Sequence, residues 1–425
     1  MLLVNYIRDH KEAVIEGMKK RNFSTEQLAL IEEVIELDDQ RKSTQFSSDS
    51  AKSEMNKLSK EIGALYKSGQ REAAEEKKAV VSARKGEVQQ MQEKLQQLEA
   101  NLEDRLLQLP NVPHPSVPYG NTDEDNEVYR AWSKELPVLS ADALAHWELA
   151  EKYRLFDLKL GVKIAGAGFP LYRGKGAKLQ RALISFFLDE ASKAGYEEVI
   201  PPHLVNEATA RATGQLPDKE GQMYHVTKDD LYLIPTAEVP VTNIYRDVLL
   251  EEKDFPIKMT AYTPCFRREA GSYGAHVRGL NRVHQFDKVE IVRIEHPEHS
   301  YEALEEMLAH VSRLLDQLEL PYRILRLCGG DLGFTSTLTF DFEVYSAAQK
   351  RWLEVSSVSN FETYQSNRLQ LRFKQDKKSV LAHTLNGSAL ALARIVAAIL
   401  ENNQTPEGIV IPEVLRAYTR FDIIQ

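Results

Sequence analysis

The sequence predicts an α+β fold: a largely antiparallel sheet flanked by helices, preceded by a long antiparallel α-helical coiled-coil arm. Three observations lead to this prediction. Residues 25–109 contain no proline and carry apolar residues at alternating steps of three and four, the spacing of a coiled-coil seam. Four prolines between residues 110 and 118 end that helical region. Beyond them, β-branched and aromatic segments follow one another without an intervening helix, which favours an antiparallel sheet.

These boundaries divide the chain into three parts. Residues 1–110 are expected to form an N-terminal domain that carries the arm. The proline-rich and acidic stretch 111–130 reads as a linker, because neither a helix nor a central strand tolerates its prolines. Residues 131–425 mix helical and strand patterns and should form the larger domain.

Composition excludes several classes of protein. The 425 residues are 43% hydrophobic and 28% charged, as in ordinary folded proteins, and the net charge of −9 excludes a globally basic nucleic-acid-binding surface. No run approaches the ~18 apolar residues of a membrane span, and the N-terminus lacks the apolar core of a signal peptide. Two distant cysteines, Cys265 and Cys328, argue against a disulfide framework and against a Cys-rich zinc site. We expect a cytoplasmic protein.

The arm is predicted to be two helices that fold back on each other. A turn at Lys67–Gln70 separates two apolar repeats, and forty residues at ~1.5 Å each give an arm of about 60 Å. Such an arm has almost no core beyond its seam and should project from a body. The two repeats are Ala51, Met55, Leu58, Ile62 and Leu65, and Val88, Met91, Leu95, Leu98 and Leu102.

Charge is distributed unevenly along the arm. Between residues 41 and 86 there are eleven basic and six acidic residues, whereas the segments on either side are acidic. A solvated coiled-coil surface explains this pattern, and so does a tip that contacts a polyanion. The bases that would make such contacts are Arg41, Lys42, Lys52, Lys57, Lys60, Lys67, Arg71, Lys77 and Lys78.

After residue 130, helical patterns are predicted over Gly174–Gly195, Glu238–Leu250, Ser300–Leu318 and Ser388–Asn402. Strands are predicted over Met259–Phe266, Phe286–Ile294, Tyr322–Leu327, Thr339–Tyr345 and Trp352–Ser356. Neither a P-loop nor a GxGxxG fingerprint is present, so a nucleotide would need another kind of phosphate site.

Arginines cluster around the first predicted hairpin. Arg267 and Arg268 end one strand, and Arg278 and Arg282 precede the next. A guanidinium offers a fixed fork of donors to phosphate oxygens, which would suit an anionic substrate. Strand arginines are also often solvent-facing, and His284 alone would be an ordinary histidine.

Four ordered motifs resemble those of class II aminoacyl-tRNA synthetases in the form found in the seryl-tRNA synthetase family. CFRREAGSYGAHVRGLNRVHQFDKVE (265–290) is similar to the family's strand–loop–strand motif, and TAE (236–238) to its serine-site loop. EVSSVSNF (354–361) is similar to its metal-bearing strand, and TLNGSALALAR (384–394) to its closing motif. The resemblance covers essentially the whole chain and implies a class II synthetase-like antiparallel sheet flanked by helices.

The resemblance implies a site for ATP and Mg²⁺. Arg267 matches the α-phosphate contact and Arg394 the γ-phosphate contact, while Glu269 and Phe286 match the residues that hold adenine. Glu354 and Ser357 match the Mg²⁺ ligands, and Arg267, Arg394 and Glu354 are the implied catalytic residues. The same segments add Arg268, to which no individual role is given, and Val283, His284, Gln285, Val355 and Ser356 as ATP-site neighbours.

The resemblance also implies the amino-acid site and the reaction: serine and ATP give seryl-adenylate and pyrophosphate, and the seryl group then passes to the 3′ end of tRNA. Taken singly, Glu238 and Ser388 could equally cap predicted helices. Ala389 and Ala393 stand where many relatives have glycine. The residues that match the serine-binding positions are Thr236, Ala237, Glu238, Glu290, Asn386 and Ser388.

Implied partners are L-serine, tRNA(Ser), tRNA(Sec) and a second copy of the chain. The arm would bind tRNA, and residues 174–202 resemble the family's dimerising element. Two alternatives stay open: a ligase that loads a small amino acid onto a carrier protein, and a non-catalytic tRNA-binding protein. The first would lack the arm, and the second should have lost Arg267, Glu269, Glu354 or Arg394.

Overall fold

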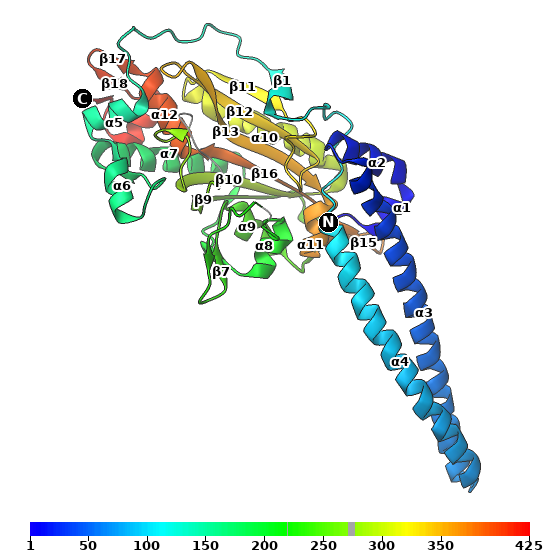
Figure 1. Ribbon diagram of the computed structural model, residues 1–425. Helices are drawn as coiled ribbons and strands as arrows, with labels where there is room; N and C mark the ends of the chain where they lie inside the picture. The colour runs from blue at the N-terminus through cyan, green and yellow to red at the C-terminus, as the bar shows by residue number, and fades with distance from the viewer. Residues whose placement is uncertain (219, 271–276) are drawn as a thin grey trace. The chain divides into compact units, whose positions relative to one another are not determined.

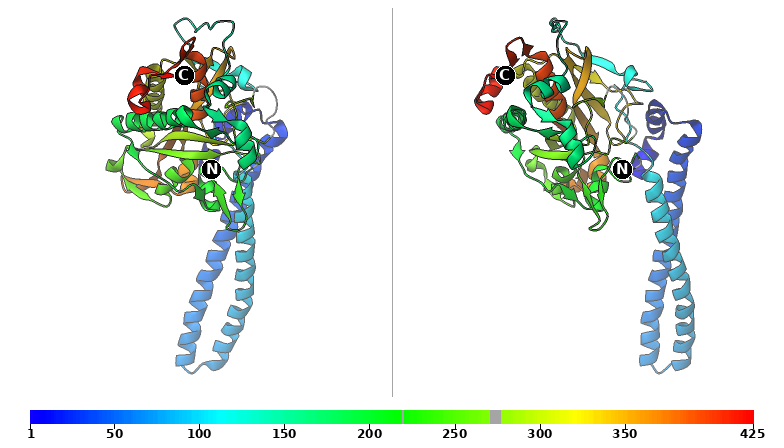
Figure 2. Two further views of the ribbon diagram at one scale, coloured as in Figure 1. Left: turned by 90° about the vertical axis from the view of Figure 1, so that its left-hand side faces the viewer. Right: turned by 60° about the vertical axis from the view of Figure 1, so that its left-hand side comes forward.

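A computed structural model describes residues 1–218, 220–270 and 277–425 (Figures 1 and 2). The described chain separates into two compact units, residues 1–19 with 23–110 and residues 20–22 with 111–425. The loop residues 271–276 of the predicted strand–loop–strand motif lie outside the described residues. Among the helices that the structure describes, none has both the length and the apolar character needed to cross a bilayer.

The first unit is dominated by two long antiparallel helices, α3 (Thr25–Lys67) and α4 (Arg71–Leu106), coloured blue to cyan in Figure 1. Ser24 starts α3 as an N-cap, because its hydroxyl accepts from the Gln27 backbone N–H at 3.2 Å. Gly69 supplies the left-handed conformation (φ 79°) of the turn between the helices. The predicted helical hairpin is therefore confirmed. Its buried seam includes Ala51, Ala74, Val88, Leu98 and Leu102, from the predicted repeats apart from Ala74.

The second unit is built on an eight-stranded sheet. Neighbouring strands are antiparallel except at one edge, where β4 pairs with β9 in parallel. The strand order is β1 (Glu127–Arg130), β11 (Tyr322–Arg326), β12 (Leu338–Ser346), β13 (Arg351–Glu362), β16 (His383–Ala391), β10 (Gln285–Glu295), β9 (Ile257–Phe266) and β4 (Glu197–Glu198). The largely antiparallel sheet predicted from the sequence is confirmed.

Alternation along the strands gives the sheet two different faces. On β12, Phe340, Phe342 and Val344 are buried in the main apolar core, whereas Asp341 and Glu343 face a cavity. The same core contains apolar residues of three long helices, α7 (Gly174–Lys193), α10 (Ser300–Gln317) and α12 (Leu392–Asn402). One face of the sheet is therefore dry, and the other is available for polar chemistry.

Two predicted helices are shorter in the structure. Glu238–Leu250 contains only α9 (Glu238–Thr242) and a 3₁₀ turn, after which Leu249–Glu251 forms strand β8. Ser388–Asn402 begins as strand, since β16 continues to Ala391 and only Leu392–Asn402 is helical. The first helix stops early because the backbone of Asp247 is left-handed (φ 61°), which a right-handed helix does not allow. The second error arises because apolar runs in a buried strand and in a buried helix look alike in sequence.

Residues 111–130 are hydrogen-bonded into the second unit. The backbone N–H of Asn111 donates to Phe334 and that of His114 to Thr337. The other helices described are α1 (Val4–Asp9), α2 (Lys11–Lys20), α5 (His146–Tyr153), α6 (Leu158–Ile164), α8 (Glu207–Thr213), α11 (Thr363–Leu369) and α13 (Glu413–Thr419). Short strands outside the large sheet are β2 (Phe156–Asp157), β3 (Leu171–Tyr172), β5 (Leu204–Val205), β6 (His225–Val226), β7 (Leu231–Leu233), β14 (Arg372–Gln375), β15 (Lys378–Leu381), β17 (Gln404–Thr405), β18 (Gly408–Val410) and β19 (Ile423–Ile424).

Candidate active site

A cavity of about 960 Å³ opens on the polar face of the large sheet. Most of the residues matched to the ATP and serine sites line it, although they come from α9, the three strands β10, β13 and β16, the start of α12 and the loops before α9 and after β9. The predicted residues in its wall are Thr236, Glu238, Arg267, Glu269, Val283, Phe286, Glu290, Glu354, Val355, Ser356, Ser357, Asn386, Ser388 and Arg394.

One end of the cavity holds a buried cluster of charge. Lys288 and Glu290, two residues apart on β10, form an ion pair, and the Lys288 ammonium also donates to the Thr236 hydroxyl at 2.8 Å. Glu238 lies nearby and accepts a hydrogen bond from the Gln365 amide at 2.6 Å. When ionised, two carboxylates and one ammonium leave one negative charge uncompensated. The cluster is therefore suited to a small cationic group.

Glu238 is poised to change its charge. Burial, with repulsion from the Glu290 carboxylate, raises the pKa of Glu238 to about 7, although the hydrogen bond from Gln365 and the charge of Lys288 oppose the shift. A cation entering the cluster would favour the ionised form. The chemistry of this end fits the ammonium and hydroxyl of a small amino acid.

Two arginines bring positive charge to the cavity wall. The Arg267 guanidinium lies 5.4 Å from the centre of the Phe286 ring, and its Nε donates to the Pro235 carbonyl at 3.3 Å. Arg394, near the start of α12, donates from Nε to the Asn281 carbonyl at 2.8 Å and from Nη1 to the Glu354 carbonyl at 2.7 Å. These bonds hold both guanidinium groups in fixed orientations, which is the arrangement that electrostatic stabilisation of an anion would need.

Glu269 lies just after the end of β9 and lines the cavity together with Arg267. Its backbone adopts the left-handed conformation (φ 48°), and one carboxylate oxygen accepts from Nε of Arg282. Positive φ at a non-glycine residue is costly and persists where surrounding contacts enforce it. The strained backbone and the ion pair together hold the Glu269 carboxylate in the cavity wall.

Carboxylate and hydroxyl side chains lie opposite one another on β12 and β13. Asp341 pairs with Ser357 in the sheet register, and Glu343 pairs with Glu354. Burial and the charge of Glu354 raise the pKa of Asp341 well above its ordinary value, and its Oδ1 is buried without a hydrogen-bond partner among the residues described. Carboxylate and hydroxyl oxygens of this kind fit a hard divalent cation such as Mg²⁺.

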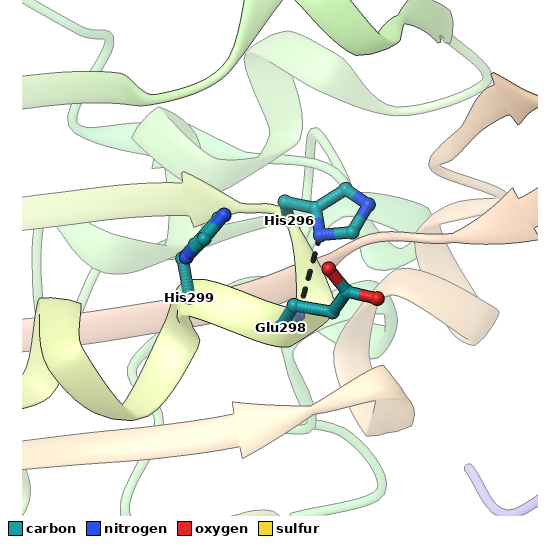
Figure 3. A group of neighbouring side chains, drawn as sticks. All are labelled: His296, Glu298 and His299. Carbon is teal, nitrogen blue, oxygen red and sulfur yellow. Dashed lines mark hydrogen bonds between the residues drawn. The ribbon is translucent and has the colours of Figure 1, made fainter.

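A second possible metal cluster lies outside this cavity. Potential ligand atoms of His296, Glu298 and His299 lie within 4.8 Å of one another (Figure 3). His296 Nδ1 already accepts from the Glu298 backbone N–H at 3.3 Å, the dashed bond in Figure 3, and its Nε2 faces the Gln375 amide at 3.2 Å. Both ring nitrogens are engaged, so this cluster is a poor metal site.

Four predicted residues do not line the cavity. Ala237 is buried in an apolar cluster, and Gln285 is exposed at the start of β10. Arg268 places its guanidinium 5.9 Å from the Tyr224 ring centre, and His284 bonds the Tyr224 hydroxyl at 2.8 Å.

Sequence reasoning also missed three polar residues of this arrangement: Lys288 and Asp341, which line the cavity, and Gln365, which donates to Glu238. Lys288 could have been found, because Phe286, Lys288 and Glu290 alternate on one face of a predicted strand.

The predicted bases of the arm fall into two groups. Arg41 and Lys42 pair with Asp38 at 2.8 and 2.7 Å, Lys77 pairs with Glu61, and Lys78 lies 3.4 Å from Glu75. Within the described part of the chain, five others take part in no ion pair: Lys52, Lys57, Lys60, Lys67 and Arg71. No carboxylate in the described arm offsets the charge of these five bases, which is therefore open to another molecule.

Family models match both the N-terminal helical unit and the part of the chain that forms the cavity. Residues 1–113 match the model described as the seryl-tRNA synthetase N-terminal domain, and residues 223–403 match the tRNA synthetase class II core domain (G, H, P, S and T). The second range contains all of the cavity residues that were matched to the ATP and serine sites.

Whole-chain relatives agree with the family models. The serine–tRNA ligase of Salinibacter ruber is 49% identical and that of Pelodictyon phaeoclathratiforme 46%, with coverage of 98% or more of each chain. The seryl-tRNA synthetase of Pyrococcus horikoshii, solved with ATP, superposes with a TM-score of 0.92 at 33% identity over 100% of this chain and 99% of that one. The cytoplasmic serine–tRNA ligase of Naegleria fowleri, solved with AMP, gives 0.87 at 27% identity over the same shares. The predicted class II fold is confirmed, and the chain belongs to the seryl-tRNA synthetase family, the class II aminoacyl-tRNA ligases for serine.

Proposed function

We propose that the cavity activates L-serine with ATP and that the activated seryl group is then transferred to the 3′ end of tRNA(Ser). In the first step a serine carboxylate oxygen attacks the α-phosphorus, the bond to the β-phosphate oxygen breaks, and pyrophosphate leaves. In the second step a hydroxyl of the terminal ribose attacks the seryl carbonyl, and AMP leaves. Support comes from one observation above all: a buried acidic cluster and two fixed arginines share a single cavity.

The roles follow from charge. Serine carboxylate and ATP are both anions, so the site must supply positive charge more than a base. Arg267 is proposed to bind the α-phosphate and Arg394 the γ-phosphate, with adenine between Phe286 and Glu269. Arg267 is held by one backbone carbonyl and Arg394 by two, which leaves the remaining N–H donors for phosphate oxygens.

Serine is proposed to bind at the buried acidic cluster. Glu238 and Glu290 would receive its ammonium and hydroxyl, with Thr236, Asn386 and Ser388 around them. A buried site that bonds a hydroxyl rejects alanine strongly, because alanine leaves polar groups without partners. Threonine would be excluded by size instead.

Mg²⁺ is proposed as the accompanying cation. Glu354 and Ser357 would hold it, with Asp341 beside them, and when bound it would neutralise phosphate charge. The orphaned Asp341 oxygen is the structural reason to add this residue to the predicted pair.

The helical hairpin is proposed to bind tRNA, with tRNA(Sec) as a second acceptor on the strength of the family resemblance. Bases without ion-pair partners, such as Lys52 and Lys57, would contact phosphates.

A homodimer through residues 174–202 completes the proposal. Ile200 is 87% exposed immediately after the edge strand β4, an arrangement that another chain would cover.

Pyrophosphate exchange into ATP tests the first step. Purified protein should exchange labelled pyrophosphate into ATP only when serine is added, and tRNA should not be needed. Exchange driven by alanine or glycine instead would favour a carrier-protein ligase. No exchange with any of the three would contradict the proposed activity.

A further inference from the structure

A buried His–Glu pair lies outside the cavity. His146, the first residue of α5, and Glu401, near the end of α12, are both 0% exposed, and His146 Nδ1 lies 2.6 Å from Glu401 Oε1. The backbone N–H of His146 donates to the same oxygen at 3.0 Å. A buried carboxylate is costly unless it is fully bonded, so this pair needs a structural or functional explanation.

The hydrogen bonds fix the tautomer of His146. The backbone N–H of Leu280 donates to its Nε2 at 2.8 Å, so Nε2 is an acceptor and the ring proton lies on Nδ1, which donates to Glu401. The other Glu401 oxygen accepts from the Ser346 hydroxyl. His146 is therefore a neutral connector with one donor side and one acceptor side.

The acceptor atom of His146, Nε2, contacts residues 278–280, which precede strand β10. The Arg278 guanidinium lies 4.6 Å from the centre of the Trp147 ring. Gly279 packs so closely that a Cβ there would be 2.2 Å from His146 Nε2, and its φ of 72° also favours glycine. Residues 278–280 thus rest on the start of α5.

The donor side reaches the same segment by another route. The Gln349 amide donates to Glu401 Oε1 at 2.9 Å, and its oxygen accepts from Asn281 Nδ2 at 2.9 Å. The Asn281 carbonyl in turn accepts from Arg394 Nε at 2.8 Å. Two connected paths therefore run from the His146–Glu401 pair to the carbonyl that orients Arg394.

We propose that His146 is a positioning residue for ATP: by holding Leu280, it places the Asn281 carbonyl and so aims Arg394 at the phosphates. Glu401 serves the same purpose by keeping the acceptor nitrogen of His146 towards Leu280. This inference rests on the proposed function, because it assumes that Arg394 binds ATP.

Two substitutions of His146 separate its contacts. In His146→Gln the amide oxygen can reach the position of Nε2 and accept from Leu280, whereas in His146→Asn the shorter amide keeps only the bond to Glu401. We expect His146→Asn to raise the KM for ATP about tenfold and His146→Gln less than threefold, with the KM for serine within twofold for both. If both variants lower only kcat, or raise both KM values equally, the role is merely structural and the proposal is wrong.

Two further variants keep the proposal testable even if the His146 variants do not fold. Gln349→Met removes the second path at a half-buried position and should raise the KM for ATP about threefold. His310→Gln changes another buried histidine, on α10 behind the sheet, and should leave both KM values unchanged. An unchanged KM for ATP in Gln349→Met, together with no folded His146 variant, would also overturn the proposal.

Calorimetric ATP binding distinguishes the two proposals. If the wild type shows no serine-dependent exchange, the proposed function fails, and the ATP affinities of the same variants still test the positioning. If the wild type exchanges and the His146→Asn variant binds ATP normally, only the positioning role fails.

Discussion

Lys288 neutralises Glu290 inside the cavity wall, where the two side chains are 6% and 2% exposed. Removing one partner of a buried pair leaves an uncompensated charge and costs about 3–5 kcal/mol. Lys288→Met should therefore lower the free energy of unfolding by about 3 kcal/mol, and urea denaturation measures this change. The double variant Lys288→Met/Glu290→Gln removes both charges and should recover most of the stability; no recovery would show that the two residues are not coupled.

Glu238 should make serine use depend on pH near neutrality. Its pKa of about 7 means that the carboxylate needed to hold an ammonium forms only as pH rises through 7. We expect kcat/KM for serine to increase across that range with an apparent pKa near 7, and the inflection to be absent in Glu238→Gln. A wild-type profile flat from pH 6 to 8 would contradict this.

The raised pKa of Glu238 also affects stability: serine use is expected to increase with pH, whereas the free energy of unfolding is expected to decrease. Because the folded state raises the pKa from 4.5 to about 7, it binds the proton more tightly than the unfolded chain. The stabilisation is complete below pH 4.5 and is lost as pH rises to 7, an expected decrease of about 3 kcal/mol. Comparing the unfolding free energies of wild type and Glu238→Gln from pH 5 to 7.5 isolates this contribution.

Arg267→Ala should reduce serine-dependent exchange by about 10²–10³, the usual loss when one preorganised donor to developing charge is removed. Arg416→Ala is a matched control, because its Nε also donates to a backbone carbonyl, that of Ile411 at 3.1 Å, but the residue does not line the cavity. Equal losses in the two variants would mean that Arg267 only supports the fold.

The arm should bind RNA through its unpaired bases. Replacing Lys52, Lys57, Lys60 and Lys67 with Gln should raise the KM for tRNA and reduce the slope of log affinity against log salt by about 0.9 for each phosphate that a lysine no longer neutralises. Exchange without tRNA should not change. Lys78→Gln, which removes a base paired with Glu75, is expected to alter the slope less. If the salt dependence of tRNA affinity is unchanged in the fourfold variant, these four lysines do not contact RNA and the proposed role of the arm is wrong.

Ile200→Asp should weaken the proposed dimer. An exposed isoleucine beside an edge strand is suited to burial against a second chain, and a carboxylate there would be desolvated on association. Sedimentation at several concentrations should show monomers. Val138→Asp, at a position that is 94% exposed away from any strand, is the control and should sediment like the wild type. A wild type that is monomeric throughout would contradict the dimer itself.

The sequence predicted those elements whose residue pattern is compatible with only one kind of secondary structure. The seam of the helical hairpin followed from its apolar periodicity, and β9, β10 and β12 followed from their β-branched and aromatic residues; all were predicted within a few residues. The end of β16 could not be predicted, because its apolar residues continue into α12 without a break in polarity. The His146–Glu401 pair was also out of reach, since 255 residues separate its members and only the folded chain brings them together.

Towards Gly69 the α3–α4 hairpin buries its apolar side chains along a two-helix seam, whereas near Ser24 α1 also packs against α3. Each helical turn is stabilised mainly by the turn that it contacts on the other helix. The free energy needed to open the hairpin therefore increases with each further pair of turns, counted from the Gly69 end. Amide protons should therefore exchange fastest at the tip and progressively more slowly towards Ser24 and Leu106. A binding surface on such a shaft can loosen and re-form locally while the rest of the chain keeps its native packing.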